Sequence, residues 1–377
     1  MKYSYTNHYK NPKQDNAMSN VADKLFPKGM TEKAFAAISA WPDYKKTALI
    51  ELDDFAKAMG VANIYYKDES TRLNLGAFKA LGGAYAVQHV LEQREANGDT
   101  SELTVCTATD GNHGRSVAWG AQQKGIPCHI FIHAGVSEGR AKILAANGAT
   151  VHRVDGNYDD SIAACIKMAE ENSWQIVSDT SWEGYYEIPT QIMAGYTVLA
   201  AEQIEQLEAL NVMPSHIILP AGCGGMAGAL IAYYWKHWRE DMPQIIVMES
   251  EMSDCVLESM QRDKIHLVDI VDETLMAGLS CGEVSELAWP LLRYGASHVI
   301  TVGDEGVKPM MRYLAKSEGN RPNIEAGECS ASGLITLKTF VDNPELAESA
   351  NINQDSIILM LGTEGATDPE LYKEIVG

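Results

Sequence analysis

Residues 70–85 read STRLNLGAFKALGGAY and place Lys79 between a Gly-Ala-Phe segment and a Leu-Gly-Gly run. The apolar run 63–67 upstream is typical of a strand, and apolar residues after Lys79 recur at helical spacing. We therefore expect Lys79 at a helix N-terminus that follows a strand. The positive end of the helix dipole there favours an uncharged amine or an imine. Taken alone, the stretch favours the alternative of a solvated lysine on an amphipathic helix.

The chain of 377 residues is long enough for two domains of ordinary size. Its net charge of -21 argues against a nucleic acid or an anionic membrane as partner. No apolar run reaches the roughly eighteen residues of a membrane span, and the first residues show no signal-peptide pattern. Seven cysteines without a C-x-x-C pair fit a reducing cytoplasm, so we expect a cytoplasmic protein without a zinc site. A disulfide bridge between Cys255 and Cys281 is left as an open alternative.

Short apolar runs alternate with helical patterns from residue 61 onward. The expected strands are 63–67, 103–107, 127–132, 150–154, 175–178, 216–220, 244–249, 298–302 and 356–361. The expected helices are 31–40 (with Thr31 as N-cap), 79–97, 112–124, 138–147, 159–172, 189–210, 225–237, 304–317, 329–341 and 369–376. This alternation predicts an α/β protein with two open, twisted parallel-sheet domains and helices on both faces of each sheet.

The domain boundaries follow from the same rhythm. We expect a larger domain formed by residues 1–85 and 190–377, and a smaller α/β domain, 86–189, inserted into it. Residues 1–30 are polar and contain several turn-forming residues, so we expect an irregular extension that packs on the body or on a partner.

A second stretch, 107–115, reads TATDGNHGR and connects an expected strand to an expected helix. Ligands of parallel α/β proteins bind at the carboxyl ends of strands, so this turn is a candidate binding site. The Asn112 amide can hold a phenolate-type oxygen, and Asp110 would place a carboxylate at the pocket mouth. Asp110 serves equally well as a plain helix N-cap. We expect His113 to be structural rather than catalytic.

The glycine-rich stretch 219–228, LPAGCGGMAG, also leads from a strand into a helix. Backbone N–H groups of such a turn can point at a phosphate, assisted by the helix N-terminus. The turn lacks the Lys-Ser/Thr of a P-loop and the acidic partner of a dinucleotide site, so a single phosphate is the better interpretation. An ordinary strand-helix turn is the alternative.

Two further strand ends carry polar residues. Asp179 follows the strand at 175–178 and is a candidate for a second pocket carboxylate. Thr363 follows the last expected strand and offers a hydroxyl among glycines. Each could be only a capped turn.

In combination, these stretches resemble the fold type II pyridoxal phosphate enzymes, the group of tryptophan synthase β and the serine/threonine dehydratases, over about residues 60–370. The resemblance implies pyridoxal 5'-phosphate as cofactor, held covalently by Lys79, with Asn112 at the ring hydroxyl and Thr363 at the pyridine nitrogen. It also implies a homodimer. The residues implied at the phosphate are Gly222, Cys223, Gly224, Gly225 and Met226. Gly362 is a departure, because some relatives carry a polar residue there.

Three features narrow the resemblance to the diaminopropionate ammonia-lyase family. Asp110 stands where dehydratases usually have a serine before Gly-Asn-His. The run from Asp179 to Tyr185 resembles the family's Asp-Thr-x-Trp-Glu-Gly-Tyr, and residues 274–283 resemble its Met-Ala-Gly-Leu-x-Cys-Gly-Glu. The resemblance implies β-elimination of D- and L-2,3-diaminopropionate to pyruvate and two ammonia. It assigns the base for the D-isomer to Asp110, and the Lys79 amine would serve as base for the L-isomer.

The carboxylates Asp110 and Asp179 suit a substrate with a second, cationic amine, which serine and threonine lack. A serine/threonine dehydratase of the same fold is the alternative enzyme, and Asp110 argues against it. A non-catalytic pyridoxal phosphate-binding protein is the alternative of another class. Such a protein would keep Lys79 and the glycine turn without needing either carboxylate. No His/Asp cluster has metal-ligand spacing, so we expect no metal.

Overall fold

The structure, a computed structural model, describes residues 3, 5–12, 17–109, 111–319 and 321–377. The chain forms two compact units. The larger unit comprises Met1–Lys28, Lys46–Thr71 and Leu199–Gly377, and the smaller unit comprises Gly29–Lys45 and Arg72–Val198. Within the described residues, no helix is long and apolar enough to cross a membrane.

A seven-stranded sheet in the order β1-β10-β9-β8-β11-β3-β2 is the centre of the larger unit. Its strands are β1 (Tyr5–Lys10), β2 (Ala48–Glu51), β3 (Asn63–Asp68), β8 (His216–Pro220), β9 (Gln244–Ser250), β10 (His298–Val302) and β11 (Ile357–Gly362). The five central strands are parallel, whereas β1 pairs with β10, and β2 with β3, in antiparallel fashion. The predicted parallel sheet with helices on both faces is confirmed for these five strands. The antiparallel edge strands β1 and β2 were not predicted, because they need no crossover helix that would mark them in the sequence.

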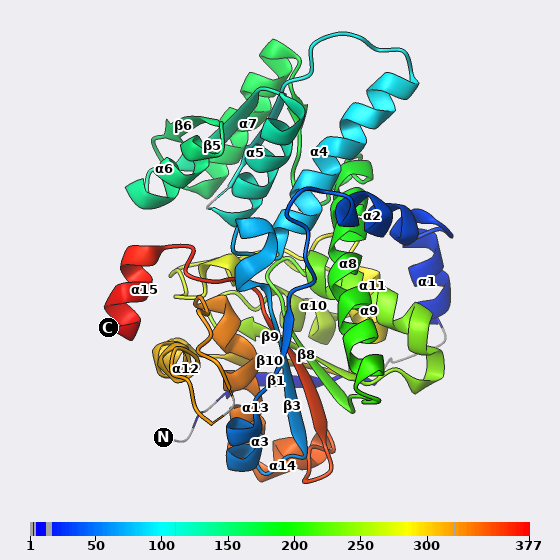
Figure 1. Cartoon of the computed structure of the whole chain (residues 1–377), viewed down its shortest axis with the longest axis vertical. Helices are drawn as coiled ribbons and strands as arrows, with labels where there is room; N and C mark the ends of the chain where they lie inside the picture. The colour runs from blue at the N-terminus through cyan, green and yellow to red at the C-terminus, as the bar shows by residue number, and fades with distance from the viewer. Residues whose placement is uncertain (1–2, 4, 13–16, 110, 320) are drawn as a thin grey trace. The chain divides into compact units, whose positions relative to one another are not determined.

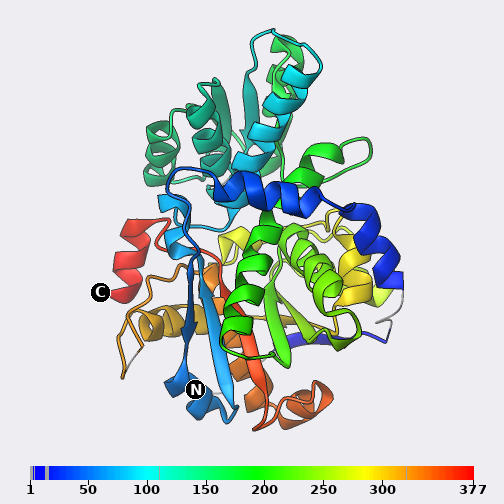
Figure 2. The ribbon, with the colours of Figure 1, turned by 45° about the vertical axis from the view of Figure 1, so that its right-hand side comes forward.

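Helices cover both faces of this sheet. Side chains of α3, α12, α13, α14 and α15 share one apolar core with the strands, including Phe55, Met311 and Phe340. Figures 1 and 2 show α8 and α9 on the other face. The helices of or entering this unit are α1 (Ala17–Leu25), α3 (Asp53–Met59), α8 (Glu187–Ala209), α9 (Gly225–Trp238), α10 (Cys255–Arg262), α11 (Trp289–Gly295), α12 (Val307–Leu314), α13 (Ser332–Asp342), α14 (Pro344–Ser349) and α15 (Pro369–Val376).

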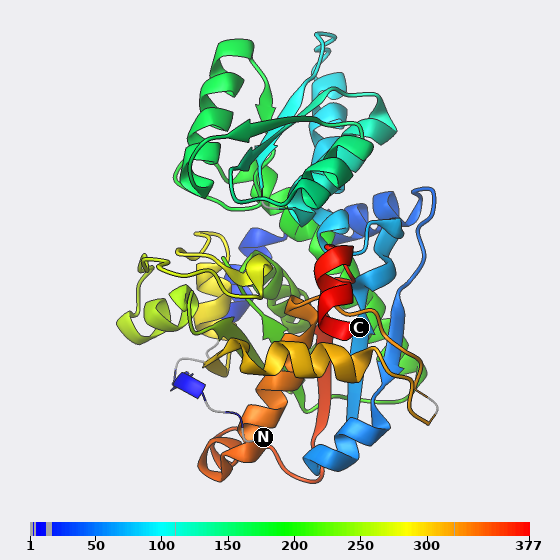
Figure 3. The same ribbon diagram turned by 90° about the vertical axis from the view of Figure 1, so that its left-hand side faces the viewer.

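The smaller unit is built on a four-stranded parallel sheet in the order β6-β5-β4-β7. Its strands are β4 (Val105–Ala108), β5 (Cys128–His133), β6 (Thr150–Val154) and β7 (Gln175–Ile176). Its helices are α2 (Met30–Ser39), α4 (Lys79–Ala96), α5 (Asn112–Lys124), α6 (Glu138–Ala146) and α7 (Tyr158–Asn172). Figure 3 shows helices on both faces of this sheet. Cys165 and Ala169 of α7 pack on Cys106 and Phe131 of the strands.

All nine predicted strands are present, each within two residues at either end, and the predicted helices are present within three residues. The prediction of an irregular segment over 1–30 is wrong where β1 and α1 form. β1 is held through its backbone at the sheet edge, and α1 buries Met18, Ala22 and Leu25, a set too short to stand out among polar residues. Thr31 is also not an N-cap, since Gly29 holds that position in the left-handed conformation.

The boundaries of the compact units differ from the predicted domain boundaries. The smaller unit takes in residues 29–45 and 190–198, which were predicted with the larger domain. Residues 72–85, predicted with the larger domain, belong to the smaller unit as well. The reason is the close packing of α4 on α5, where a Cβ built at Gly120 would lie 2.7 Å from the Cα of Ala84. The predicted division into a cofactor-binding domain and an inserted domain stays a prediction.

Candidate active site

Lys79 is the first residue of α4, as the sequence predicts, and Phe78 precedes it at the N-cap. The Leu-Gly-Gly run after Lys79 is explained by packing within the smaller unit. A Cβ built at Gly82 would lie 2.5 Å from the Tyr196 ring, and one at Gly83 would lie 2.5 Å from Ser116 Oγ. The two glycines therefore let α4 approach its neighbours closely, which fixes the start of the helix and the backbone of Lys79.

Asp179 lies three residues beyond β7, the strand that pairs in parallel with β4. Because β4 leads into the turn before Asn112, the Asn112 turn and the Asp179 turn follow the same edge of the small sheet. The Lys79 Nζ donates a hydrogen bond to Asp179 Oδ2. Both side chains are partly buried, with 24% of the lysine and 19% of the aspartate side chain exposed. The structure thus brings two of the predicted site residues together in a direct ion pair.

His113, in the first turn of α5, lies near the same carboxylate oxygen of Asp179 as Lys79 does. Its Nε2 donates to the carbonyl oxygen of Val177 at 2.8 Å, two residues before Asp179. Its Nδ1 lies 3.7 Å from Asp179 Oδ2 and has no hydrogen-bond partner among the described residues, although His113 is only 4% exposed. His113 therefore binds the backbone that leads to Asp179, and its structural rather than catalytic role stays a prediction.

The charges around Asp179 favour its ionised form. Burial alone would raise the pKa of Asp179, but His113 and the Lys79 ammonium lower it below the usual range of an aspartate. Burial lowers the pKa of His113, and the nearby Lys79 lowers it further, whereas Asp179 opposes the shift. At neutral pH the centre therefore contains an ionised Asp179 carboxylate and a neutral His113 imidazole.

Asp110 lies outside the described residues, so the structure places only its neighbours. Thr109 Oγ1 accepts hydrogen bonds from the amides of Gly111 and Gly114, at 3.1 and 3.2 Å. A Cβ built at Gly114 would lie 2.3 Å from the Thr109 methyl carbon, which explains the second glycine of Gly-Asn-His-Gly. Thr109 thus provides a side-chain hydrogen bond at the start of α5, whose first residue is Asn112.

The glycine turn, residues 222–226, connects β8 to α9 in the larger unit. Gly224 is the N-cap of α9 with a φ of 83°, and no side chain caps the helix. A Cβ built at Gly224 would also lie 2.5 Å from Leu292 Cδ1, so both backbone conformation and space require glycine. Gly225 and Met226 open the helix, and Cys223 accepts a backbone hydrogen bond from Ser285 at 2.9 Å. The turn therefore places the first-turn amides of α9 at the positive end of a fourteen-residue helix whose N-cap glycine offers no capping side chain.

Thr363 follows β11, which is the parallel neighbour of β8. The residue is 3% exposed, and its Oγ1 lies 3.5 Å from Ser330 Oγ. Ser330 Oγ donates to the carbonyl oxygen of Glu364 at 2.6 Å and accepts from its amide at 2.8 Å, which fixes this turn. Gly362 has no room for a side chain, because a Cβ there would lie 2.1 Å from the Tyr66 hydroxyl oxygen.

The segment 274–283 supports the glycine turn, a role that its sequence alone did not reveal. A Cβ built at Gly222 would lie 3.2 Å from the Gly278 carbonyl oxygen and 3.3 Å from Leu279 Cα. A Cβ at Gly278 would in turn lie 3.1 Å from Cys329 Sγ, next to Ser330. The Met-Ala-Gly-Leu segment thus packs between the glycine turn and the residues beside Thr363.

The sequence reasoning also gave no role to Glu249 and Tyr185. Glu249, at the end of β9, accepts the amides of Val256 and Leu257 at 2.8 Å and lies 3.7 Å from Cys255 Sγ. Cys255 Sγ is also 3.7 Å from the Gly222 carbonyl oxygen, so this buried carboxylate stands behind the glycine turn.

None of the seven cysteines, all of them described, forms a disulfide, so Cys255 and Cys281 are not bridged.

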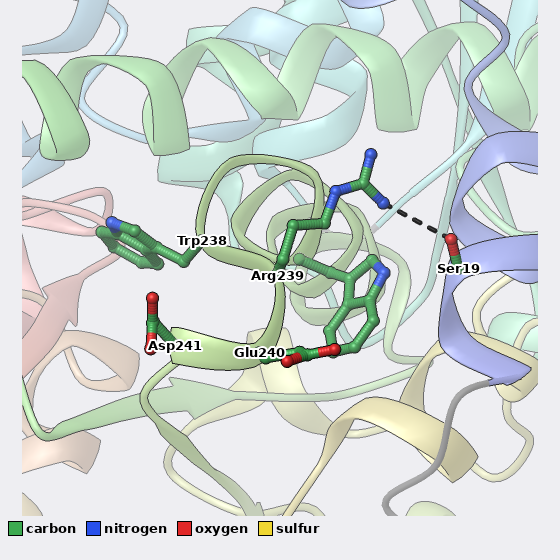
Figure 4. Close-up of a pocket in the computed structure, with 6 residues that line it drawn as sticks. Ser19, Trp238, Arg239, Glu240 and Asp241 are labelled. Carbon is green, nitrogen blue, oxygen red and sulfur yellow. Dashed lines mark hydrogen bonds between the residues drawn. The ribbon is translucent and has the colours of Figure 1, made fainter.

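A hollow of about 420 Å³ lies elsewhere in the larger unit (Figure 4). It is lined by Ser19, Trp235, Trp238, Arg239, Glu240 and Asp241. Arg239 Nη1 donates to Ser19 Oγ at 3.4 Å across it. No residue of the predicted site lines this hollow, which is at the opposite end of α9 from the glycine turn.

Polar and glycine-rich turns at the carboxyl ends of parallel strands are the features expected of an α/β enzyme that binds a phosphorylated cofactor. The Lys79–Asp179 pair and the glycine turn both lie at such strand ends. Residues 40–361 match the family described as pyridoxal-phosphate dependent enzyme, and the chain belongs to this family. The motif-based resemblance is confirmed to that extent.

Relatives within the family are diaminopropionate ammonia-lyases. The chain is 37% identical to the diaminopropionate ammonia-lyase of Escherichia coli K12, over 95% of this chain and 96% of that protein. It is 36% identical to the Salmonella typhimurium enzyme, over 89% of each. The fold matches the crystal structure of the Escherichia coli enzyme with an aminoacrylate-PLP azomethine reaction intermediate, with a TM-score of 0.90, 36% identity, and coverage of 100% of this chain and 98% of that one.

Proposed function

We propose that this protein is a pyridoxal phosphate-dependent carbon–nitrogen lyase that converts 2,3-diaminopropionate and one water into pyruvate and two ammonia. The observation that carries the proposal is the ion pair of Lys79 with Asp179 at the strand ends of the smaller unit. An amine beside a carboxylate fits an amino-acid substrate that brings a second cationic amine. The similarity to diaminopropionate ammonia-lyases along nearly the whole chain supports the same substrate.

The glycine turn fits the phosphate of the cofactor. Its N-cap residue, Gly224, offers no capping side chain to the first-turn amides and has no space for a Cβ. We propose that Lys79, Asn112, Thr363 and the glycine turn (Gly222, Cys223, Gly224, Gly225 and Met226) hold pyridoxal 5'-phosphate. The neutral Thr363 hydroxyl, rather than a carboxylate, is proposed to meet the pyridine nitrogen. Bound pyridoxal phosphate supplies the electron sink that makes the α-proton of the substrate removable.

The side chains divide the proton transfers between them. The Lys79 amine would accept the α-proton of the L-isomer and return a proton as ammonium to the departing β-amine. Asp179 has a lowered pKa and is ionised at neutral pH, so its part is to hold a cation, either the Lys79 ammonium or the substrate's second ammonium. Asp110 would accept the α-proton of the D-isomer.

A substrate panel tests the proposal. Purified protein is mixed with D- and L-2,3-diaminopropionate, D- and L-serine and L-threonine, and pyruvate is followed with lactate dehydrogenase while ammonia is counted separately. We expect turnover of both diaminopropionate isomers, two ammonia per pyruvate, and selective loss of the D-isomer reaction in Asp110→Asn. Faster release from serine would favour the dehydratase alternative. No release from any substrate, with pyridoxal phosphate bound, would favour a non-catalytic binding protein.

We further propose a cytoplasmic homodimer. The loop between α10 and α11 exposes apolar side chains of Leu267, Ile270 and Val271, the last of them 86% exposed, and such side chains suit an interface. Light scattering is expected to give twice the chain mass of 41.2 kDa. A monomer mass would contradict the proposal.

A further inference from the structure

The run Asp179–Tyr185, which the catalytic scheme uses only at its first residue, closes into a small turn. Trp182 and Tyr185 face each other in an antiparallel bridge, and the Tyr185 amide donates to the Trp182 carbonyl oxygen at 2.8 Å. The two rings stack with centroids 4.2 Å apart and planes 11° apart. Gly184, with a φ of 86°, lets the chain reverse between them. The turn therefore brings Tyr185 back to the strand that the chain has just left.

The Tyr185 hydroxyl bonds to the backbone of that strand's end. It donates to the carbonyl oxygen of Ile176 and accepts from the amide of Ser178, both at 3.0 Å. β7 is an edge strand of the four-stranded sheet, so no strand of the described residues pairs with its outer side. One hydroxyl thus satisfies an acceptor and a donor that a neighbouring strand would otherwise engage.

The inner side of the same segment is held just as firmly. The Val177 amide donates to the Cys106 carbonyl oxygen at 2.9 Å, and the Val177 carbonyl oxygen accepts from His113 at 2.8 Å. The three residues immediately before Asp179 are therefore fixed from both edges, by β4 and His113 on one side and by Tyr185 on the other.

We propose that Tyr185 is a positioning residue that holds the Asp179 carboxylate against the Lys79 amine. The inference rests on the proposed function, since it assigns a role within that site. Tyr185 acts through the backbone of Ile176 and Ser178, to which its hydroxyl is bonded. A shift of a catalytic group by about 1 Å can lower the rate on the order of 100-fold. Loss of the Tyr185 hydroxyl is therefore expected to lower the reaction rate.

The chemistry of the hydroxyl suits this task. Burial raises the pKa of Tyr185, and the nearby Asp179 charge raises it further, so the phenol keeps its proton throughout the neutral range. It can therefore donate to Ile176 and accept from Ser178 at every pH at which the enzyme works. A ring that served only to stack on Trp182 would need no hydroxyl, and phenylalanine would replace it without loss.

The test compares Tyr185→Phe with Tyr186→Phe in the holoenzyme. Tyr186 is the adjacent tyrosine, and its side chain is 40% exposed, which makes it a matched control. We expect kcat for diaminopropionate to fall roughly tenfold in Tyr185→Phe, with KM within about twofold and an unfolding midpoint close to that of the control. The visible absorbance of the bound cofactor, titrated with pH, should shift in Tyr185→Phe and not in Tyr186→Phe.

A second pair of variants shows whether Tyr185 acts through Asp179. In an Asp179→Asn background, adding Tyr185→Phe should change neither kcat nor the absorbance titration, because the group being positioned is gone. If Tyr185→Phe fails to fold, Trp182→Ala loosens the same turn while keeping the hydroxyl. It should produce a smaller loss that also vanishes in Asp179→Asn.

Additive effects in the double variant, or identical behaviour of Tyr185→Phe and Tyr186→Phe, would overturn the proposal. If the wild type releases no pyruvate from diaminopropionate, the proposed function is wrong. The absorbance titrations then still test whether Tyr185 positions Asp179. Overlaid titrations of the two phenylalanine variants would then reject the positioning role. A shift confined to Tyr185→Phe that is absent in Asp179→Asn would support it.

Discussion

The two regions of the proposed site are built in opposite ways. The Lys79 region of the smaller unit consists of an ammonium, a carboxylate and an imidazole that bias one another's protonation. The glycine turn of the larger unit is shaped by backbone conformation and close packing, as at Gly222 and Gly224. The first arrangement suits moving protons, and the second suits holding a phosphate in one place.

Because the Lys79 region and the glycine turn are built differently, different measurements report on each of them. Changes in the Lys79 region should alter kcat and pH dependence while cofactor affinity changes less, except where the covalent attachment itself is removed. Changes in the glycine turn should alter cofactor affinity and stability while the pH profile of the remaining holoenzyme stays the same. The four variants below test this division.

Lys79→Ala should have the largest effect. Loss of the proposed covalent attachment and of the proposed base is expected to lower kcat by at least about 1,000-fold, and the visible band near roughly 410–420 nm should vanish. The absorbance spectrum and pyruvate release are the measurements. Lys67→Met is the control, because it removes a fully buried lysine that pairs with Glu202 in the larger unit. The fraction of this variant that folds should keep the absorbance band. A band retained in Lys79→Ala would place the attachment elsewhere.

Asp179→Asn should lower kcat by about 100-fold, because the neutral amide cannot hold the cation beside the reacting carbon. The lowered pKa of Asp179 means that its charge stabilises the cofactor-free fold above about pH 4, and this contribution is lost as pH falls further. The melting-temperature difference from wild type should therefore shrink between pH 6 and pH 3. Glu183→Gln, a change at an exposed carboxylate in the same turn, is the control. An unchanged difference across this range would contradict the assigned charge.

Gly224→Ala should act on binding rather than on chemistry. The left-handed φ costs alanine about 1–2 kcal/mol, and the clash with Leu292 displaces the turn, so the Kd for pyridoxal phosphate should rise at least about tenfold. Equilibrium titration of the cofactor-free protein measures this. Gly60→Ala shares a positive φ of 69° but has no atoms within 4 Å of the added methyl. Gly60→Ala should lose stability without losing cofactor affinity. Equal losses of affinity in Gly60→Ala and Gly224→Ala would contradict the assignment of the glycine turn to cofactor binding.

Glu249→Gln should have the smallest effect on turnover, less than about threefold, because the carboxylate stands behind the glycine turn. Burial raises its pKa to about 8. The stability that its neutral form gives is complete below about pH 4.5 and is lost as pH rises toward 8. The permanently neutral glutamine should therefore gain in melting temperature relative to wild type between pH 5 and pH 8. A constant difference would show that Glu249 does not titrate in this range.

Much of this architecture could be predicted from local sequence, because parallel strands and their helices leave a repeating pattern. The positions of Lys79, Asn112 and Thr363 at the ends of strands or the starts of helices followed from that pattern. Strands β1 and β2 could not be predicted, because edge strands are held by backbone pairing and need no apolar signature. The pairing of Lys79 with Asp179, 100 residues apart, needed the sheet order that makes β4 and β7 neighbours.

The roles of Tyr185 and Gly278 were hidden for a related reason. Each acts on a backbone that its own sequence position does not identify, Tyr185 on the end of β7 and Gly278 on the glycine turn. The Trp-Glu-Gly-Tyr and Met-Ala-Gly-Leu motifs were signals that these segments matter, but only the fold shows what they support.

The most direct test of the account is to find the lysine that holds the cofactor. The purified protein is loaded with pyridoxal phosphate, reduced with sodium borohydride and digested, and the modified peptide is identified by mass spectrometry. The account predicts a pyridoxyl-phosphate adduct on Lys79 in wild type, which is absent in Lys79→Ala and retained in Asp179→Asn. An adduct on another lysine, or none in wild type, would contradict it.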